Sequence, residues 1–358
     1  MFTNEPQTDV IDVRSDEKFD EVKIAAFLKG KLPGSENPLA VRQFGGGAAN
    51  LTYLLDYGTH EYVLRRPPLG PVAKSAHDMK REYTVLSKLY QAFPYAPRAF
   101  LFSDDHSLIG SDFFVMERRH GIVVRRKYQD KFKGDDDAGR KMSFALVDAL
   151  AQFHAVDYDA IGLSELGKPD GFVERQIEGW NRRWHKAKEQ DSADFDFVYE
   201  WLKNNVPATS RSTLVHNDFK LDNCMLAADD PSKLVAVFDW DMCTLGDPLC
   251  DLGALLTYWY EPTDPPYIKA MTPMPGDYHG FATRRELVDR YAQTSGLPMD
   301  DIEFYYALGL YRLVVIIQQI YIRYVRGQTK DKRFAGMGQV VPMIIEAAKN
   351  VATGELKI

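Results

Sequence analysis

The sequence contains few cysteines, and their spacing argues against two classes of cross-linked domain. Of the 358 residues only three are cysteine, Cys224, Cys243 and Cys250, and none belongs to a Cys-x-x-Cys pair. An odd number without paired spacing indicates neither a disulfide framework nor a zinc ribbon. This cysteine usage is typical of a reducing compartment, and we expect the protein in the cytoplasm.

An export signal and a membrane span are also missing. The first residues, MFTNEPQTDVIDV, lack the basic start and the apolar stretch of a signal peptide. The most apolar late segment, residues 307–325, is interrupted by arginines and glutamines, so no run approaches the roughly 20 apolar residues of a membrane span. We expect this segment to be a buried core helix and expect no membrane partner.

The sequence has fewer basic than acidic residues. The chain has 44 Lys and Arg against 51 Asp and Glu, a net charge of −7, whereas a nucleic-acid-binding protein normally presents a basic face. We therefore expect no nucleic-acid partner. Hydrophobic residues at 45% and charged residues at 27% are typical of a folded globular protein, and the length favours two domains.

The hydrophobic pattern changes part-way along the chain. Residues 39–117 alternate as strands around one amphipathic helix over 76–92, whereas helical periodicity dominates beyond residue 117. This pattern predicts an α+β protein with a small antiparallel sheet followed by a larger, mainly helical part. We place the first domain at residues 1–117, with residues 1–35 as a helical or extended lead-in, and the second at 118–358.

One loop gathers chemically active side chains. The stretch LVHNDFKLDNCML, residues 214–226, places Asp218 and Asn223 five positions apart between two short apolar runs, and Asp239 follows the apolar run LVAVF. Carboxylate and amide oxygens suit Mg²⁺, which leaves its other positions to water and phosphates. The remaining acid, Asp218, is then available to accept the proton of an attacking hydroxyl.

The motifs HNDFKLDN and FDWDMCTLGDPLCDL resemble the protein-kinase-like aminoglycoside phosphotransferase family, in particular the subgroup found joined to acyl-CoA dehydrogenases. The resemblance covers about residues 35–330 and implies a two-lobed kinase fold that uses ATP and Mg²⁺. It implies Asp218 as catalytic base, Asn223 and Asp239 as metal ligands, and His216 and Asp251 as supports of the loop.

The same resemblance assigns the first domain to nucleotide binding. The stretch FGGGAANLTYLL places glycines where backbone N–H groups can approach phosphates, although the motif is weak by itself. The third strand carries arginine where kinases have lysine, with a helix glutamate as its partner. The candidate nucleotide-binding residues, including the hinge after the last strand, are Gly46, Gly47, Asn50, Arg65, Glu82, Glu117 and Arg118.

The acceptor is expected to be a small molecule, because only eleven residues separate Asp239 from Asp251, too few to seat a peptide. Residues 123–133 and 180–188 are basic and aromatic, which is typical either of a solvated helix face or of a patch for an anionic substrate. The subgroup is implicated in phosphorylating 4-hydroxyacyl-CoA before elimination by the fused dehydrogenase. A hydroxyacyl-CoA substrate and a separate acyl-CoA dehydrogenase partner are thus implied.

Three other functions are compatible with parts of the sequence to different degrees. A nucleotide-binding pseudokinase or scaffold is favoured by Arg65 in place of lysine and by the irregular glycine loop. A metal hydrolase built on His216 and Asp218 would rest on a His-x-Asp spacing that is too common to carry it. Dehydrogenase activity of this chain is not supported, because the sequence shows no flavin fingerprint.

Overall fold

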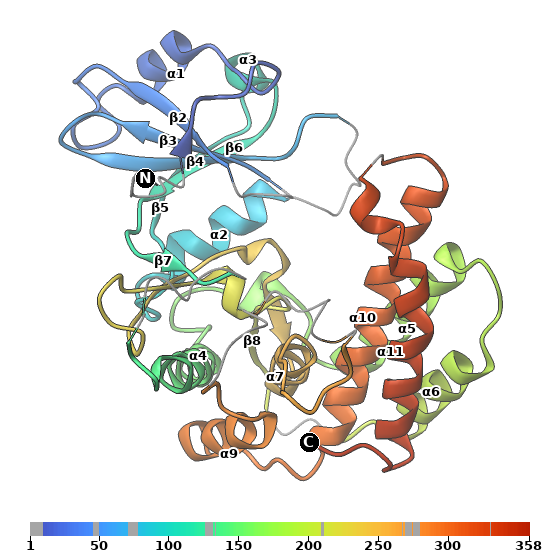
Figure 1. Cartoon of the computed structure of the whole chain (residues 1–358). Helices are drawn as coiled ribbons and strands as arrows, with labels where there is room; N and C mark the ends of the chain where they lie inside the picture. Colours follow the sequence, from blue (N-terminus) through green and yellow to red (C-terminus); the bar gives the residue numbers. More distant parts are fainter. Residues whose placement is uncertain are drawn as a thin grey trace. The chain divides into compact units, whose positions relative to one another are not determined.

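The structure, a computed structural model, describes residues 10–45, 50–70, 78–125, 132, 134–208, 211–266, 268, 274, 280–329 and 331–358. By its contacts the chain forms two compact units (Figure 1). The first contains Met1–His120 and Ala236–Met242, and the second contains Gly121–Val235 and Cys243–Ile358. The sequence placed the boundary after Glu117 and did not foresee that the segment around Asp239 belongs with the first unit.

The first unit is built on a six-stranded antiparallel sheet of order β1-β2-β3-β4-β6-β5. Its central strands β3, β4 and β6 are buried at most positions, and the core includes Tyr53, Leu55, Leu64 and Val115. The elements are β1 (Val10–Ile11), α1 (Glu21–Leu28), β2 (Ala40–Phe44), β3 (Leu51–Asp56), β4 (Glu61–Arg66), α2 (Met79–Leu89), β5 (Ala99–Ser103), α3 (His106–Ile109), β6 (Phe113–Glu117) and the 3₁₀ turn η3 (Trp240–Met242).

The helix α2 follows the predicted periodicity over a shorter range than expected. Its first turn is capped by Asp78, whose side chain accepts a hydrogen bond from the Arg81 amide at 2.9 Å. It ends at Leu89, so the prediction that it extends to residue 92 is wrong; the chain leaves the helix in a turn instead. Glu82 lies on its buried face beside Val85 and Leu86.

The second unit is mainly helical. Its helices are α4 (Ala138–His154), α5 (Phe172–Ala187), α6 (Ala193–Asn204), α7 (Pro248–Thr257), α9 (Arg284–Ser295), α10 (Ile302–Val325) and α11 (Met337–Ala352). Its shorter elements are β7 (Ile122–Val123), η1 (Ser164–Leu166), β8 (Thr213–Val215), η2 (Leu221–Asn223), β9 (Cys224–Leu226), β11 (Thr244–Gly246) and η4 (Lys332–Phe334), and β10 (Leu234–Val237) leads back to the first unit. The expected α+β class is confirmed, with an antiparallel sheet first and helices after it.

The tryptophan-bearing part of this unit forms two consecutive helices, α5 and α6. They are separated because Ser192 accepts a hydrogen bond from the Phe195 amide at 3.3 Å and thereby begins α6. The aromatic side chains still pack together: Trp184 of α5 stacks on Phe195 of α6, which in turn stacks on Tyr311 of α10.

The helix α10 is the core element of this unit and packs against α7, α11, α5 and α6. Figure 1 shows α10 and α11 running side by side. It is long and apolar enough to cross a membrane by length and composition, yet 72% of its most apolar window is buried inside the protein. The prediction that this segment is a buried core helix is therefore confirmed.

Two glycines bring α7 and α10 into close contact. A Cβ atom at Gly253 would lie 2.2 Å from the Tyr305 carbonyl oxygen, and one at Gly309 would lie 2.6 Å from the Gly253 carbonyl oxygen. No side chain fits at such distances, since both obstacles are backbone atoms. The backbones of the two helices therefore pack directly on each other.

We expect Gly253→Ala to lower the free energy of unfolding by about 1–3 kcal/mol or more, because the added methyl group must push α10 away. Gly179→Ala on α5 is the matched control: only the ends of Arg182 and Arg183 lie near its Cβ position, so higher helix propensity should stabilise by on the order of 1 kcal/mol. Urea unfolding followed by circular dichroism compares them. Equal stability of the two variants would contradict the close packing.

Candidate active site

In the first unit, Arg65 lies between two carboxylates. It occupies the middle of the sheet on β4, opposite Thr52 of β3 and Phe114 of β6. Its Nε atom lies 3.1 Å from Glu82 Oε2, and its Nη2 atom forms an ion pair with Asp239 Oδ1. The Nε contact lacks the alignment of a hydrogen bond and so acts through charge. The predicted pairing of this arginine with a helix glutamate is thus present in the geometry.

Burial sets the protonation behaviour of this cluster. Burial, together with the charges of Asp239 and Asp241, raises the pKa of Glu82 to about 8 against the opposing charge of Arg65. Burial acts to lower the pKa of Arg65, but the surrounding carboxylates hold it above its ordinary value. The arginine therefore stays charged. The Trp240 amide donates a hydrogen bond to Glu82 Oε1 at 3.4 Å, which ties α2 to the segment that carries Asp239.

Backbone strain marks both candidate loops. Among the non-glycine residues that the structure describes, positive φ occurs at Asn217, with 64°, and at Asp239, with 71°. This conformation costs of order 1–3 kcal/mol for a residue with a side chain, and it persists where the surroundings hold it. Here it occurs at one predicted metal ligand and at the residue that precedes the predicted base.

The glycine loop is described only at its end. Gly46 and Gly47 lie outside the described residues. Asn50 precedes β3 and is 5% exposed, and both its amide nitrogen and its amide oxygen are buried without a hydrogen-bond partner in the described part of the chain. A buried amide normally has partners, so Asn50 is placed to bind a polar group that enters the loop.

The predicted hinge residues are partly engaged within the first unit. The Glu117 amide donates to the Arg98 carbonyl at 2.8 Å, and a Glu117 side-chain oxygen accepts from the Arg98 amide at 3.2 Å. The Arg118 guanidinium lies over the ring of Phe44, 4.6 Å from its centroid. The N–H group of Glu117 is therefore already used, which the sequence did not indicate.

In the second unit, Asp218 stands at the centre of the loop between β8 and η2. Asn223 donates from its amide nitrogen to both the carbonyl oxygen and Oδ2 of Asp218, at 2.9 Å each. Lys220 places its ammonium group 3.0 Å from the same Oδ2 atom. The Asp218 amide in turn donates to His216 Nδ1 at 3.2 Å. The predicted base, metal ligand and support thus lie together.

Asp251 fixes this loop from α7. Its carboxylate is 1% exposed and accepts hydrogen bonds from the backbone amides of His216 at 2.5 Å and Asn217 at 2.7 Å. His154 of α4 lies 3.2 Å away through Nε2, and its Nδ1 atom lies 2.6 Å from the Tyr291 hydroxyl of α9. The predicted support is therefore one part of a buried network that joins three helices to the loop.

The charge state of Asp251 follows from these contacts. Burial acts to raise the pKa of the carboxyl group, but the hydrogen bond and charge of His154, the charge of His216 and its backbone amide hold the pKa below its ordinary value of 3.8. Asp251 is therefore an anion that accepts hydrogen bonds from the catalytic-loop backbone and lies beside His154.

Lys220 is the site residue that the sequence analysis missed. The charges of Asp218 and Asp222 raise its pKa even though burial acts to lower it, and its ammonium group lies 5.2 Å from the centroid of the Tyr258 ring. Asp222 is itself partly buried, and burial raises its pKa. The available signal for Lys220 was its place in the sequence two residues after Asp218, but the position alone does not reveal the direction in which a side chain turns.

The candidate ligand atoms, an amide oxygen of Asn223 and a carboxylate of Asp239, are of the type that Mg²⁺ binds. Within the described ranges, no three His, Cys, Asp or Glu side chains gather closely enough to hold a metal by themselves. Mg²⁺ needs only one or two protein oxygens beside water and phosphate, however, and Asn223 turns its amide nitrogen to Asp218, which leaves its amide oxygen directed elsewhere. Asn223 and Asp239 remain predicted ligands.

Comparison with known proteins agrees with this geometry. Residues 40–287 match the model of the phosphotransferase enzyme family, known as APH. The chain belongs to this family. It is 31% identical over 333 residues to acyl-CoA dehydrogenase family member 11 of Rattus norvegicus, covering 90% of this chain and 42% of the rat protein. The chain thus spans less than half the length of this relative.

Solved structures establish the kinase-like fold. The crystal structure of a presumed aminoglycoside phosphotransferase from Ralstonia eutropha is 28% identical, with a TM-score of 0.81, over 94% of this chain and 99% of that one. The aminoglycoside phosphotransferase APH(4)-Ia in complex with AMP-PNP and hygromycin B is 17% identical, with a TM-score of 0.58, over 93% and 99%. The expected protein-kinase-like fold and phosphotransferase family are both confirmed.

We expect Asp251→Asn to destabilise the protein by about 1–3 kcal/mol, because asparagine offers one acceptor oxygen and leaves a buried amide N–H facing its own NH₂ group. A carboxyl group whose pKa is lowered on folding contributes stability above its ordinary pKa and loses it as the pH falls through the folded pKa. The stability difference between wild type and variant should therefore hold above about pH 5 and shrink below it.

Thermal unfolding between pH 3 and pH 8 measures this difference. Asp170→Asn, at an exposed position in the same unit, is the control and should match wild type throughout. A difference between wild type and Asp251→Asn that stays constant down to pH 3 would show that the charge of Asp251 plays no part.

Proposed function

We propose that this chain is an ATP- and Mg²⁺-dependent phosphotransferase that acts on the hydroxyl group of a small molecule. The observation that carries the proposal is the Asp218 carboxylate, held by Asn223 and Lys220 on a loop that Asp251 fixes, in a chain of the phosphotransferase enzyme family. A carboxylate held in this way is preorganised to bind and orient a hydroxyl group.

The two oxygens of Asp218 are not equivalent. Asn223 and Lys220 both approach Oδ2, whereas Oδ1 receives no hydrogen bond in the part of the chain that the structure describes. The side chain is 18% exposed, so Oδ1 is the atom that would accept the proton of the acceptor hydroxyl. Lys220 neutralises the carboxylate in the resting state and is placed to stabilise negative charge that develops near it.

The first unit would bind the nucleotide. Arg65 offers a charged guanidinium for phosphate oxygens, and the buried amide of Asn50 lacks a partner in the described residues. The amide oxygen of Asn223 and the carboxylate of Asp239 would hold Mg²⁺, which when bound screens the phosphate charges. Because the Glu117 N–H is used by Arg98, adenine would depend on other backbone groups of the hinge.

The acceptor proposal is a hydroxyacyl-CoA. Its support is the identity to proteins named acyl-CoA dehydrogenase family members over the region that this chain spans, and the basic, aromatic segment 180–188. A separate acyl-CoA dehydrogenase is the proposed partner, and the cytoplasm the proposed location.

A nucleotide-binding pseudokinase is the second candidate. One observation favours it: Arg65 stands where kinases have lysine, and it pairs directly with Asp239, a predicted metal ligand. Turnover separates the two proposals, since a pseudokinase binds Mg-ATP without transferring phosphate to any acceptor.

We expect Asp218→Asn to lower kcat roughly 10²- to 10⁴-fold, because the proton acceptor is lost, while Mg-ATP binding is retained. Turnover is measured by ADP release over hydroxyacyl-CoAs, sugars, amino alcohols and aminoglycosides, and binding by thermal shift. Asp229→Asn, at an exposed position of the same unit, is the control and should act like wild type. Undiminished turnover in Asp218→Asn would refute the assignment of the base.

We expect Arg65→Met to weaken Mg-ATP binding and to destabilise the protein, because Glu82 and Asp239 both lose their cationic partner and the buried Glu82 must take up a proton. Arg65→Lys keeps the charge and should retain most of the thermal shift on adding Mg-ATP. Adding Glu82→Gln to Arg65→Met should recover stability but not nucleotide binding. Recovery of both would mean that Arg65 serves the fold alone.

A further inference from the structure

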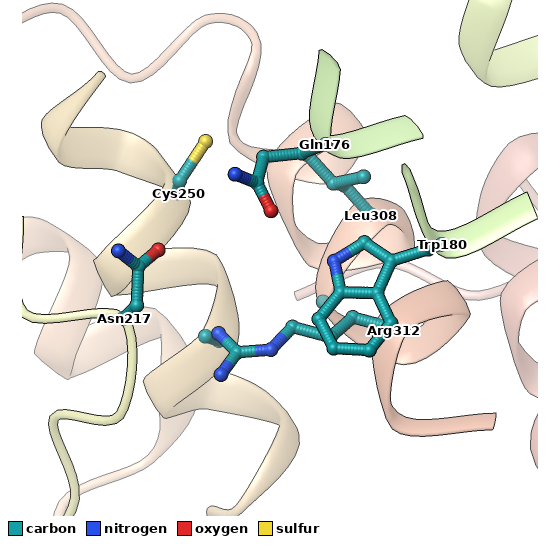
Figure 2. A pocket seen from close by; sticks show the side chains of 8 residues that line it. Gln176, Trp180, Asn217, Cys250, Leu308 and Arg312 are labelled. Carbon is teal, nitrogen blue, oxygen red and sulfur yellow. The ribbon is translucent and has the colours of Figure 1, made fainter. Parts of the chain in front are cut away.

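A narrow pocket in the second unit is lined by residues that the proposed mechanism does not use. It lies between α5, α7, α10 and the start of the catalytic loop, and Figure 2 shows its side chains. The amides of Gln176 and Asn217, the thiol of Cys250 and the guanidinium of Arg312 surround a common space, beside the indole of Trp180. The pocket is therefore polar on several sides and has an aromatic wall.

Arg312 is the one charged residue among those that line the pocket. The Cys250 thiol is neutral, since burial, and then Asp247 and Asp251, raise its pKa well above its usual value, with Arg312 opposing them. The carboxylates of those two aspartates are occupied: Asp251 by the catalytic loop, and Asp247 by the Leu249 amide and the Tyr305 hydroxyl. The pocket thus has a net positive character.

No carboxylate in the described part of the chain forms an ion pair with Arg312, Arg183 or Arg182. Arg312 and Arg183 both lie against the Trp180 ring, with 5.5 and 4.3 Å between guanidinium carbon and ring centroid. Partial loss of solvent lowers the pKa of Arg183, and the positive charges of Arg312 and Arg182 lower it further. The Nε atom of Arg312 is buried without a hydrogen-bond partner in these residues.

Arg182 and Arg183 are exposed, whereas Arg312 lines the pocket with its Nε atom buried, so an anion in the pocket would offset the cost of burying the Arg312 charge. Arginine presents a planar fork of N–H donors that fits a carboxylate or a phosphate group. The amide of Gln176 can add a hydrogen bond. A cationic acceptor such as an amine would instead meet repulsion here.

The pocket adjoins the candidate base. Asn217, which lines it, directly precedes Asp218 and is fixed through its backbone amide to Asp251. Lys220, the ion-pair partner of Asp218, has its ammonium group 5.2 Å from the centroid of the Tyr258 ring. A molecule with an anionic group at Arg312 could therefore present a hydroxyl group to Asp218.

We propose that this pocket is a subsite for an anionic group, a carboxylate or a phosphate, carried by the phosphate acceptor at a distance from its reacting hydroxyl. The inference rests on the proposed phosphotransferase function and narrows its acceptor to hydroxylated anions. Arg312 is the specificity-determining residue, Trp180 holds its guanidinium, and Gln176 is a neutral donor to the same group.

The test uses acceptor pairs in which one member carries an anionic group that the other lacks: glycerate against glycerol, and glycerol 3-phosphate against glycerol. A third pair is a hydroxyacyl-CoA against the corresponding hydroxyacyl-pantetheine, which lacks the phosphates and the adenosine of CoA. Turnover and calorimetric binding are measured on the full chain with saturating nucleotide, AMP-PNP replacing ATP for binding. Wild type should favour the anionic member of at least one pair tenfold or more. Arg312→Gln should abolish that preference, with the larger effect on KM than on kcat.

Arg323→Gln is the matched control, an exposed arginine on the same helix, and should keep the wild-type preference. Gln176→Leu changes a different helix and should weaken anion binding several-fold. It tests the subsite independently if Arg312→Gln fails to fold, which thermal unfolding of each variant checks. Arg312→Lys should retain part of the preference.

The outcomes distinguish this inference from the proposed function. Turnover that ignores the charge of the acceptor overturns the subsite and leaves the phosphotransferase standing. If no acceptor turns over, calorimetry decides: Arg312-dependent binding of an anionic member supports the subsite although transfer has failed, and its absence overturns the subsite. Inorganic phosphate is the last comparison. If it binds as tightly as every hydroxylated anion, and if Arg312→Gln weakens its binding as much, the pocket binds a free ion and the acceptor role is overturned.

Discussion

The carboxylate of Asp251 is the constraint on which the second unit's chemistry depends. It accepts two consecutive backbone N–H groups, from His216 and Asn217, at the point where the chain turns through positive φ. A strained residue persists only where its surroundings hold it, and here the anion supplies that hold. Asp218 follows directly in the same loop, so the direction of its side chain is set by a buried charge on α7.

The first unit also has a buried ion beside a residue with positive φ, but there the ion is a cation. A buried cation, Arg65, lies between a helix carboxylate and Asp239, whose backbone is also in the left-handed region. In each unit a buried ion holds a non-glycine residue of a candidate loop in an unfavourable conformation. Such ions contribute less to net stability than to the selection of one arrangement, because their desolvation offsets much of their attraction.

Sequence reasoning was most successful where chemistry is local. The spacing of Asp218 and Asn223 within one loop and the periodicity of the helices around α10 could be read from the chain, and the fold class with them. It failed where a contact joins distant residues: His154 meets Asp251 across 97 positions and Tyr291 across 137. Lys220 was overlooked although it stands in the same motif, since its role depends on the direction in which its side chain turns. The roles of the individual site residues remain predictions.

The direct contact of α7 and α10 has a consequence for how acceptor choice can change. Through Gly253 and Gly309 the helix that carries Asp251 and the helix that carries Arg312 form one rigid support, so neither can shift without the other. Trp180 and Gln176, by contrast, belong to α5 and line the pocket from outside that support. Divergence or design could therefore vary α5 to admit different molecules while the catalytic loop keeps its alignment.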